Sequence, residues 1–537
     1  MSSNNSTLVS QNSSALNTAE DVIYPDDATW ILTSAFIIFT MQSGFGLLEA
    51  GMVSKKNESN IMVKNAVDVI YGGLSYWMFG FAFSFGIDEG SNPFCGIGYF
   101  LTDADESQMG EVFARYFFQL SFATTSTTIV SGAMAERVNL KAYTIFSFVN
   151  TLTYCFPAHW FWSNNGWLKQ MGVVDVAGCG PVHLVGGVSG LVATILLKPR
   201  TGRFDEKGNP NKLEMASPTN VLLGTFMLWW GWLGFNCGST FGITGAKWKL
   251  ASRSAVVTLN GSIGGGIFGM MYSMFMFKGK IMIDMFANGI LGGLVGITAI
   301  CAVARPWESL IIGFIGGLIS CTGSTLLLKL RIDDPVGCVP THLFASVWGM
   351  VAVGLFVEKD SLENLSENYG VFKGGSWKMV GVQVLGVVAV SLWAATITII
   401  LLLLVNQIIP LRMPLEMELE GADKWEHGIG EEEDLSMPEV QDTHGIENPA
   451  LVEVSNGEVI SLEDKEDISK KHLFTENTIN QLPSNETLEK SKRSSQKYSS
   501  WKRRIKFRSH SVDVELKGRN GEEPPDENRP RVLSFCE

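Results

Sequence analysis

Long stretches of this 537-residue chain carry almost no charge. Residues 30–409 are apolar and glycine-rich, whereas residues 410–537 are densely charged and have almost no long apolar run. Runs of about 20 apolar residues recur in the first region, which is the length that a helix needs to cross a bilayer. The amphipathic periodicity of a soluble core is missing there. The scarcity of charge therefore argues against a soluble globular protein and predicts a polytopic membrane protein.

Other signatures are missing as well. None of the eight cysteines forms a C-x-x-C pair, so a metal site is unsupported. The sequence shows no nucleophile–base set and no phosphate-binding loop. Residues 1–29 lack the charged start and the cleavage site of a signal peptide. We therefore expect neither an enzyme nor a cofactor, and no nucleic-acid partner.

The apolar runs predict an all-α fold of eleven transmembrane helices. Their ranges are 30–53, 61–85, 113–134, 143–162, 182–197, 218–237, 255–277, 281–303, 307–328, 341–357 and 380–404, and the fifth and tenth are short. The domains that follow are an N-terminal tail 1–29, a membrane domain 30–409, a C-terminal regulatory segment 410–430 and a cytoplasmic disordered tail 431–537.

Glycosylation sequons and loop charges predict the orientation. The N-terminal tail carries sequons at Asn4, Asn5 and Asn12, although chance matches are common in a stretch so rich in Ser and Asn. With this tail outside, the inner loops hold 13 Lys and Arg and the outer loops about eight. We therefore expect an extracellular N-terminus, and an odd number of spans places the C-terminus in the cytoplasm.

A nine-residue stretch occurs twice, 159 residues apart. D-V-A-G-C-G-P-V-H ends at His183, D-P-V-G-C-V-P-T-H ends at His342, and 10 of the 19 residues from Asp175 onward match the second copy. Self-similarity of this kind indicates a fold built from two copies of one unit. Five spans separate the histidines, so the copies are predicted to be inverted, with repeat one at 30–197, repeat two at 218–357 and an eleventh helix at 380–409.

The repeated histidines are the leading functional candidates. An imidazole in the middle of a membrane is costly and usually faces the interior of the bundle. Two imidazoles can share a proton and offer a small molecule one donor and one acceptor. Packing histidines bonded to the backbone are the second interpretation, and a metal site is the third. Asp175 and Asp334 precede the two helices and are interpreted as structural helix caps.

Aromatic and charged side chains supply further candidates. Trp162, Phe118 and Ser239 fall toward the outer ends of their spans, where ring faces and a hydroxyl can hold a small cation. An interfacial aromatic belt is the alternative, which we accept for Trp160, Trp229 and Trp230. Glu49 and Lys64 lie near the inner ends of spans one and two, and we interpret them as structural residues that can pair.

These residues belong to motifs that resemble the ammonium transporter (Amt) family over roughly 400 residues. The motifs are G-F-G-L-L-E-A-G (44–51), S-G-A-M-A-E-R (131–137), G-W-L-G-F-N-C-G-S (231–239) and the two nine-residue copies with Asp333 before the second. The resemblance implies a homotrimer in the lipid bilayer of the plasma membrane that carries ammonium or ammonia, with methylammonium as an analogue. It assigns a pore pair, His183 and His342; an outer binding site, Trp162, Phe118 and Ser239, bordered by Phe122; and a stacked phenyl gate, Phe118 and Phe235.

The C-terminal region has two parts. G-x-D-x-x-x-H-G (421–428) resembles the family's regulatory helix, which implies docking beneath a neighbouring subunit and a regulatory or structural role for His427. The basic segment 490–508 is a candidate for anionic lipid, or for kinases acting at Ser494, Ser495 or Ser509, and a solvated run of charge is the alternative. The long tail also raises a second function, a sensor that reports pore occupancy.

Overall fold

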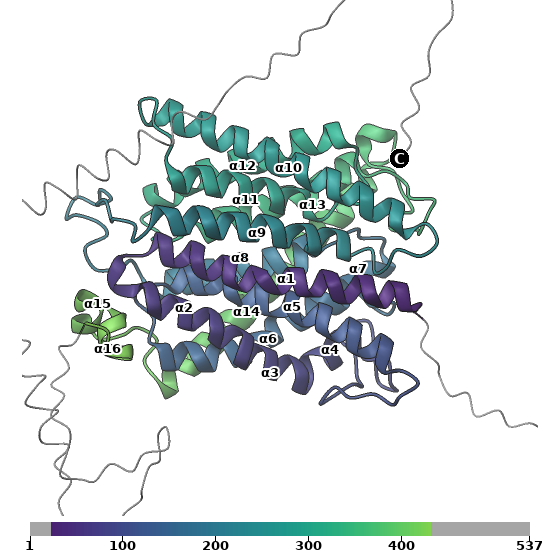
Figure 1. The fold of residues 1–537 in the computed structure, drawn as a ribbon, viewed down its shortest axis with the longest axis horizontal. Coiled ribbons are helices and arrows are strands. Elements are labelled where there is room, and N and C mark those ends of the chain that lie inside the picture. Colours follow the sequence, from purple (N-terminus) through teal and green to yellow (C-terminus); the bar gives the residue numbers. More distant parts are fainter. Residues whose placement is uncertain (1–22, 431–537) are drawn as a thin grey trace, which may run out of the picture. The chain divides into compact units, whose positions relative to one another are not determined.

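The computed structural model describes residues 23–430 (Figure 1). The sequons at Asn4, Asn5 and Asn12 lie outside the described residues. The predicted tail 431–537, with its basic segment and the serines Ser494, Ser495 and Ser509, lies outside them too.

The described part of the chain consists of helices and connecting loops. The α-helices are α1 (Pro25–Met52), α2 (Glu58–Val67), α3 (Gly73–Ser75), α4 (Phe81–Phe85), α5 (Met109–Met134), α6 (Leu140–Trp162), α7 (Trp167–Gln170), α8 (Val185–Leu197), α9 (Pro218–Gly238), α10 (Lys247–Met276), α11 (Ile283–Thr298), α12 (Pro306–Lys329), α13 (Ala345–Phe356), α14 (Trp377–Ile408), α15 (Leu415–Glu420) and α16 (Ala422–His427). Four π-helical turns are η2 (Asp68–Gly72), η3 (Tyr76–Gly80), η4 (Cys179–Leu184) and η5 (Val339–Phe344), and two short 3₁₀ turns are η1 (Lys55–Asn57) and η6 (Val371–Lys373).

The helical segments fall where the apolar runs predicted them. Lys55–Phe85, Cys179–Leu197 and Val339–Phe356 are continuous helices that contain π-helical turns. Within residues 23–430, seven helices are long and apolar enough to cross a membrane. A helix satisfies its backbone polar groups internally, as a lipid environment demands. The chain is thus an all-α membrane protein with several candidate spans.

One boundary differs clearly from the prediction. We expected a span over residues 281–303, but α11 ends at Thr298. The chain turns there, and residues 299–303 bond to two other segments: Val176 N–H, next to Asp175, donates to Ala299 O at 2.9 Å, and Glu358 N–H, just after α13, donates to Val303 O at 2.9 Å.

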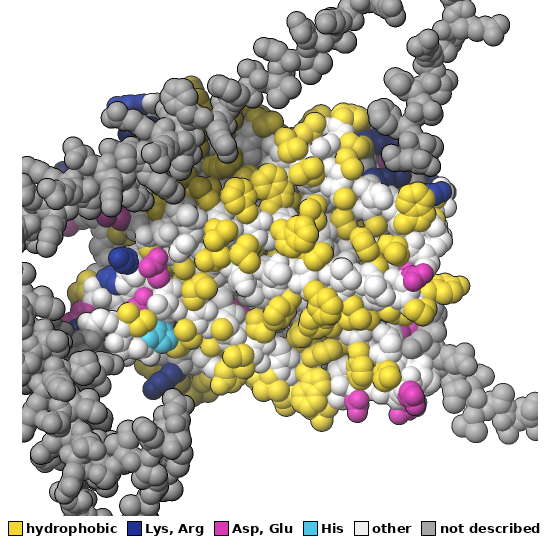
Figure 2. Space-filling model, in the orientation of Figure 1, with side chains coloured by type: hydrophobic (Ala, Val, Ile, Leu, Met, Phe, Trp, Pro, Cys, Tyr) yellow, Lys and Arg dark blue, Asp and Glu magenta, His cyan; other side chains and the backbone are white. Residues whose placement is uncertain are grey.

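The surface is divided between apolar and charged side chains. In Figure 2 the visible apolar side chains cover the middle of the helical body, and the visible charged side chains lie toward its ends. The large hydrophobic side chains that are exposed include Phe275 on α10, Leu392 on α14 and Phe226 on α9. A surface of this kind is expected where lipid surrounds the helices.

The helices end at two faces, which we name by the ends of α1. The amino face holds the start of α1 and the end of α9, where Trp30 Nε1–H donates to Cys237 O at 3.3 Å. The carboxyl face holds the end of α1 and the start of α9, where Ser217 N–H donates to Gly51 O at 3.1 Å. Helices α1 and α9 are therefore antiparallel. In Figure 1, α7 lies toward the amino face, and α15 and α16 lie at the carboxyl face.

Helices α10, α11 and α12 pack with their backbones in close approach. A Cβ atom on Gly265 would collide with the carbonyl of Gly289, and one on Gly313 would collide with the carbonyl of Gly261. Small residues allow transmembrane helices to gain van der Waals contact along their length. These three helices therefore pack as one layer, in which α10 and α11 contact α9.

Helices α15 and α16 contact the loops of their own chain at the carboxyl face. Asp423 accepts hydrogen bonds from Ser59 N–H at 3.0 Å and Asn60 N–H at 2.7 Å, at the start of α2. Glu426 accepts from Leu140 N–H at 3.1 Å. The Nε2 atom of His427 lies 3.2 Å from the amide nitrogen of Asn60.

Candidate functional site

The two copies of the nine-residue stretch form equivalent turns. In each copy a glycine in the left-handed region, Gly178 (φ 87°) or Gly337 (φ 76°), precedes the π-helical turn that carries the histidine. Glycine enters this region without the steric cost that a Cβ atom brings. π-Helical turns occur frequently at functional sites. The shared Gly is therefore needed for the shape of the backbone that presents each histidine.

The aspartates of both copies bond to the first N–H groups of these turns. Asp175 accepts from the N–H groups of Gly178, Cys179 and Gly180 at 2.7–2.9 Å. Asp334 accepts from the N–H groups of Gly337 and Val339 at 3.0 and 2.7 Å. These contacts are those of helix caps, and they satisfy donors that have no partner within the helix.

The two histidines meet at the centre of the bundle. Their Nδ1 atoms are 3.3 Å apart and their ring centroids 5.3 Å apart, and both rings are buried. One Nδ1 must donate and the other accept. The donating ring is then left with an acceptor at Nε2, and the accepting ring with an N–H donor at Nε2. The pair can thus offer one acceptor and one donor to a small neutral molecule.

His183 is held by aromatic rings. Its imidazole stacks on Trp232, with centroids 4.8 Å apart and ring planes within 13°, and Trp232 is fixed by a 2.9 Å hydrogen bond from Nε1 to Thr298 Oγ1. The Nε2 atom of His183 has no hydrogen-bond partner among residues 23–430. Sequence analysis did not single out Trp232, although it lies in the same motif as Phe235.

A parallel phenyl stack lies beside the histidines, but it differs from the predicted one. Phe122 and Phe235 are stacked with centroids 3.9 Å apart and planes within 9°. We expected Phe118 in this position. Phe118 lies one helical turn earlier on α5. Its ring centroid is 4.9 Å from that of Phe122 and 5.1 Å from that of Phe241. The stacked pair is therefore Phe122 and Phe235.

The predicted outer residues lie on the amino-face side of this stack. Trp162 meets Phe122 edge-on at 5.9 Å, and its Nε1–H donates to Asp175 O at 2.9 Å. Ser239 is one turn beyond Phe235, and its hydroxyl donates to Phe235 O at 2.8 Å. Phe235 in turn lies 5.5 Å from the His183 ring. Trp162, Phe122, Phe235, His183 and His342 thus form a continuous series of rings.

The other predicted tryptophans have different surroundings. Trp230 is 56 % exposed, as an interfacial residue would be. Trp160 is only 4 % exposed, and its Nε1–H donates to Phe94 O at 2.9 Å. The interpretation of Trp160 as a belt residue was wrong, because the loop that carries Phe94 covers it.

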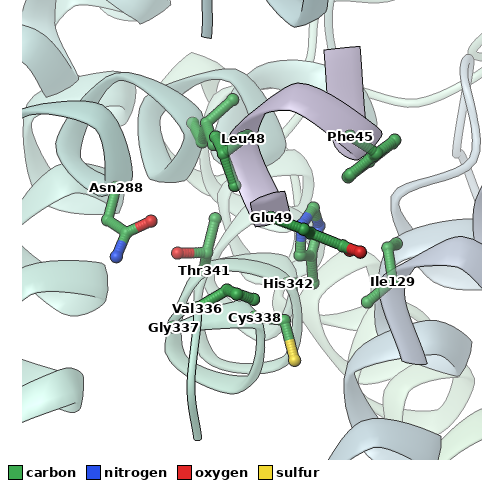
Figure 3. Close-up of a pocket in the computed structure, with 11 residues that line it drawn as sticks. Phe45, Leu48, Glu49, Ile129, Asn288, Val336, Gly337, Cys338, Thr341 and His342 are labelled. Carbon is green, nitrogen blue, oxygen red and sulfur yellow. The ribbon is translucent and has the colours of Figure 1, made fainter. Parts of the chain in front are cut away.

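A small cavity adjoins His342 on the side of the carboxyl face (Figure 3). Its volume is about 20 Å³, enough for roughly one water-sized molecule. The lining residues are Phe45, Leu48, Glu49, Ile129, Asn288, Leu291, Val336, Gly337, Cys338, Thr341 and His342. Sequence analysis treated Glu49 as structural, although an ionisable residue inside an apolar span is itself a signal of function.

Glu49 does not pair with Lys64 as expected. The Glu49 carboxylate accepts from Ser131 Oγ at 2.6 Å and Asn65 Nδ2 at 2.8 Å. The Lys64 ammonium group is buried and has no hydrogen-bond partner among the described residues. Both residues lie on one face of the α1–α2 pair, but the polar groups of α2 and α5 reach Glu49 first.

The second copy is anchored to the carboxyl face by a buried ionic cluster. Arg200 donates to Asp333 through Nε at 2.8 Å and through a second guanidinium nitrogen at 2.9 Å, and it also contacts Glu136. Burial raises the pKa of the Asp333 carboxyl, but hydrogen bonds and positive charge from Arg200 outweigh it and lower the pKa from 3.8 to about 2. Asp333 is therefore ionised at neutral pH.

Comparison with known proteins identifies the family of the chain. The model of the Ammonium Transporter Family matches residues 29–432. A putative ammonium transporter 3 of Caenorhabditis elegans is 49 % identical over 421 residues, which span 76 % of this chain and 61 % of that protein. The chain thus covers less than two thirds of this relative. Ammonium transporter 3 of Dictyostelium discoideum is 39 % identical, with 75 % of this chain and 93 % of the relative covered.

Solved structures agree with the fold. A protein described as a sensor Amt protein has a TM-score of 0.68 at 30 % identity and covers 75 % of this chain and 98 % of its own. Mep2 of Candida albicans has a TM-score of 0.67 at 26 % identity, with 73 % of this chain and 87 % of that chain covered. Because the family model matches residues 29–432, which include both histidine turns, the chain belongs to the Ammonium Transporter Family, whose members are transporters rather than enzymes.

Proposed function

We propose that this protein carries ammonium across the plasma membrane, taking it up at the amino face and passing ammonia along the histidine pair. The observation that carries the proposal is the buried contact of His183 and His342, at 3.3 Å between Nδ1 atoms, next to the stacked phenyls. Such a pair has hydrogen-bonding capacity for a small amine and no fixed charge. Family membership supports ammonium as the substrate.

The first step is recruitment of ammonium by Trp162, Phe118 and Ser239, next to Phe122. Aromatic faces attract a cation, and the Ser239 oxygen accepts a hydrogen bond from it, so part of the water shell can be replaced. The stacked rings of Phe122 and Phe235 then close the path and act as the gate. A ring contact of 3.9 Å leaves no room for a hydrated ion.

The second step selects for ammonia. An ion that passes the stack loses its hydration in apolar surroundings, which costs several kcal/mol or more. Ammonium avoids this cost by giving its proton to water at the amino face, because the neutral ammonia that remains can exchange hydrogen bonds with the two histidines. Potassium has no proton to lose, so the same path rejects it.

The proposal includes the arrangement in the membrane. The helical body forms eleven spans in two inverted repeats, with the amino face outside and the carboxyl face in the cytoplasm. The antiparallel packing of α1 and α9, the first helices of the two repeats, supports the inversion. We further propose that three subunits assemble, each with its own path, and that methylammonium serves as an analogue.

Replacing both histidines by alanine tests the central step. His183→Ala with His342→Ala removes every imidazole of the pair and leaves the outer aromatic site intact. We expect the ratio of ammonium to potassium permeability to fall toward one, measured as reversal potentials under voltage clamp together with labelled methylammonium uptake. A double variant that reaches the membrane and keeps its selectivity would contradict the proposal.

A further inference from the structure

We propose that the carboxylate of Glu49 forms a second ammonium site, in the cavity that adjoins His342 on the side of the carboxyl face. This inference rests on the function proposed above and deepens it. It gives the inner half of the path a charged binding site, whereas the outer half binds the cation with aromatic rings and a hydroxyl.

The position of Glu49 is the first support. Helix α1 brings it one turn before its end at Met52, and Figure 3 shows the Glu49 side chain among those that line the cavity with His342. No other carboxylate lines this cavity. Ser131 and Asn65 both donate to Oε2, so they fix the carboxylate without using Oε1.

The charge around Glu49 is the second support. Its side chain is 1 % exposed, and within residues 23–430 no cationic group lies in ion-pair contact with it. A buried carboxylate without a counter-ion is strongly disfavoured. A cation in the cavity would supply the missing partner.

The other buried charged residues near Glu49 do not line the cavity. Lys64 on α2 is fully buried and interacts with Glu49 over a distance, but it is not part of the cavity wall. Asp68 is turned toward α6, where its carboxylate accepts hydrogen bonds at 2.8 Å from Tyr143 and Ser147. Ammonia that has passed His342 takes up a proton from water at the carboxyl face, and Glu49 is therefore the carboxylate that the resulting ammonium ion meets first.

The cavity suits a small protonated amine. Besides the carboxylate, its wall contains the hydroxyl of Thr341 and the amide of Asn288, both of which can accept a hydrogen bond. Ammonium has N–H donors in four directions and a volume close to that of water. A cavity of about 20 Å³ holds one such ion and excludes a hydrated one.

Transport measured separately from each face tests the site. Sealed inside-out and right-side-out vesicles from cells that express the full chain would be compared for initial uptake of labelled methylammonium. Glu49→Gln keeps the side-chain shape and one carbonyl acceptor for Ser131 and Asn65, but removes the charge. We expect the half-saturating concentration to rise about tenfold in inside-out vesicles, as for loss of one charge-assisted hydrogen bond, and to change less than about twofold in right-side-out vesicles.

Asp68→Asn is the matched control, because it removes a buried carboxylate of the same bundle that does not line the cavity. An unchanged half-saturating concentration for Glu49→Gln in inside-out vesicles, or the same rise in Asp68→Asn, would overturn the inference. Wild-type vesicles that take up no methylammonium from either side would instead contradict the transport function itself.

A second measurement uses the wild-type chain and so does not depend on folding of a variant. Dicyclohexylcarbodiimide labels carboxyl groups in apolar surroundings, and peptide mass spectrometry reports the labelled residue. We expect methylammonium to slow the labelling of Glu49 and to leave the labelling of Asp68 unchanged. Labelling of Glu49 that does not respond to methylammonium would refute the site.

Discussion

The two copies of the repeat present their histidines alike but are anchored by different chemistry. Val174, just before Asp175 in the first copy, exchanges two backbone hydrogen bonds with the Gln383 amide of α14, at 3.1 and 2.6 Å. The equivalent residue of the second copy is Asp333, which is bound by Arg200. A neutral anchor therefore suffices near the amino face, whereas the carboxyl face uses a buried ion pair.

Helices α9 and α1, which flank His183 and His342, also differ in that the charged side chain is on the side of the carboxyl face. Aligning Gly231–Gly238 of α9 with Gly44–Gly51 of α1 places Trp232 opposite Phe45, Phe235 opposite Leu48 and Asn236 opposite Glu49. Trp232 packs on His183, and Phe45 packs on His342 with centroids 6.1 Å apart. Phe235 on α9 thus has an aliphatic counterpart on α1, and the Glu49 carboxylate of α1 stands where α9 has the amide of Asn236. The pseudo-symmetry keeps the histidines in place while the two entrances diverge.

The largest expected effect is a difference in stability between loss of the Arg200–Asp333 ion pair and loss of the Gln383–Val174 hydrogen bonds. Arg200→Ala removes the hydrogen-bonded partner of the buried Asp333 carboxylate, leaves it only the Arg203 guanidinium at 3.2 Å as an ion-pair partner among the described residues, and also takes the guanidinium from Glu136, so we expect a loss of about 3–5 kcal/mol in the free energy of unfolding. Gln383→Ala removes two hydrogen bonds from the first anchor and leaves Val174 unsatisfied, for an expected loss of about 1–3 kcal/mol. Denaturation in detergent, with Arg331→Ala as a surface control, measures both. Equal losses would mean that the anchors do not differ in strength.

The ion-paired anchor should also respond to acid. The pKa of Asp333 is about 2 in the folded chain and 3.8 in its ordinary range. A depressed pKa contributes stability that is present above about pH 4 and is lost as the pH falls toward 2. The difference amounts to about 2 kcal/mol. Asp333→Asn should be less stable than wild type by this amount at pH 7, and the gap should close between pH 4 and pH 2.

Thermal unfolding of the two proteins across this pH range measures the gap, with Asp103→Asn in an exposed loop as the control. If Asp333→Asn were less stable than wild type by the same amount at pH 2 as at pH 7, the negative charge of Asp333 would not be the source of the difference.

The smallest effect concerns the caps. Asp175 receives three backbone N–H groups and Asp334 two, so Asp175→Ala should cost about 2 kcal/mol and Asp334→Ala about 1 kcal/mol. Thermal unfolding of the two single variants gives the comparison. A larger loss of stability in Asp334→Ala than in Asp175→Ala would indicate that Asp334 stabilises the fold mainly through contacts other than those with the turn.

Much of the helical body could be predicted from the sequence, because apolar length is a direct consequence of the solvent that the helices face. The contact of His183 and His342 agrees with what the repeat, with an odd number of predicted spans between the histidines, led us to expect. The capping positions of Asp175 and Asp334 followed from local chemistry alone. These predictions depend on spacing along the chain, which the sequence contains in full.

Contacts between helices were harder to predict. Phe118 and Phe122 are four residues apart and lie on the same face of α5, so periodicity cannot tell which of them reaches Phe235. The depth of α5 relative to α9 decides this, and that depth depends on contacts between helices that are far apart in the sequence. Glu49 was misjudged for a similar reason, because a pairing with Lys64 depends on how α1 and α2 are rotated against each other.

The docking of α16 has a consequence for biosynthesis. Asp423 bonds to backbone groups of residues 59 and 60, which are separated from it by 364 and 363 positions. During synthesis the start of α2 must therefore wait, with its N–H groups hydrated, until almost the whole helical body has emerged from the ribosome. Closure of this face therefore comes late in folding, and a chain that stops before residue 423 leaves these N–H groups without the Asp423 carboxylate.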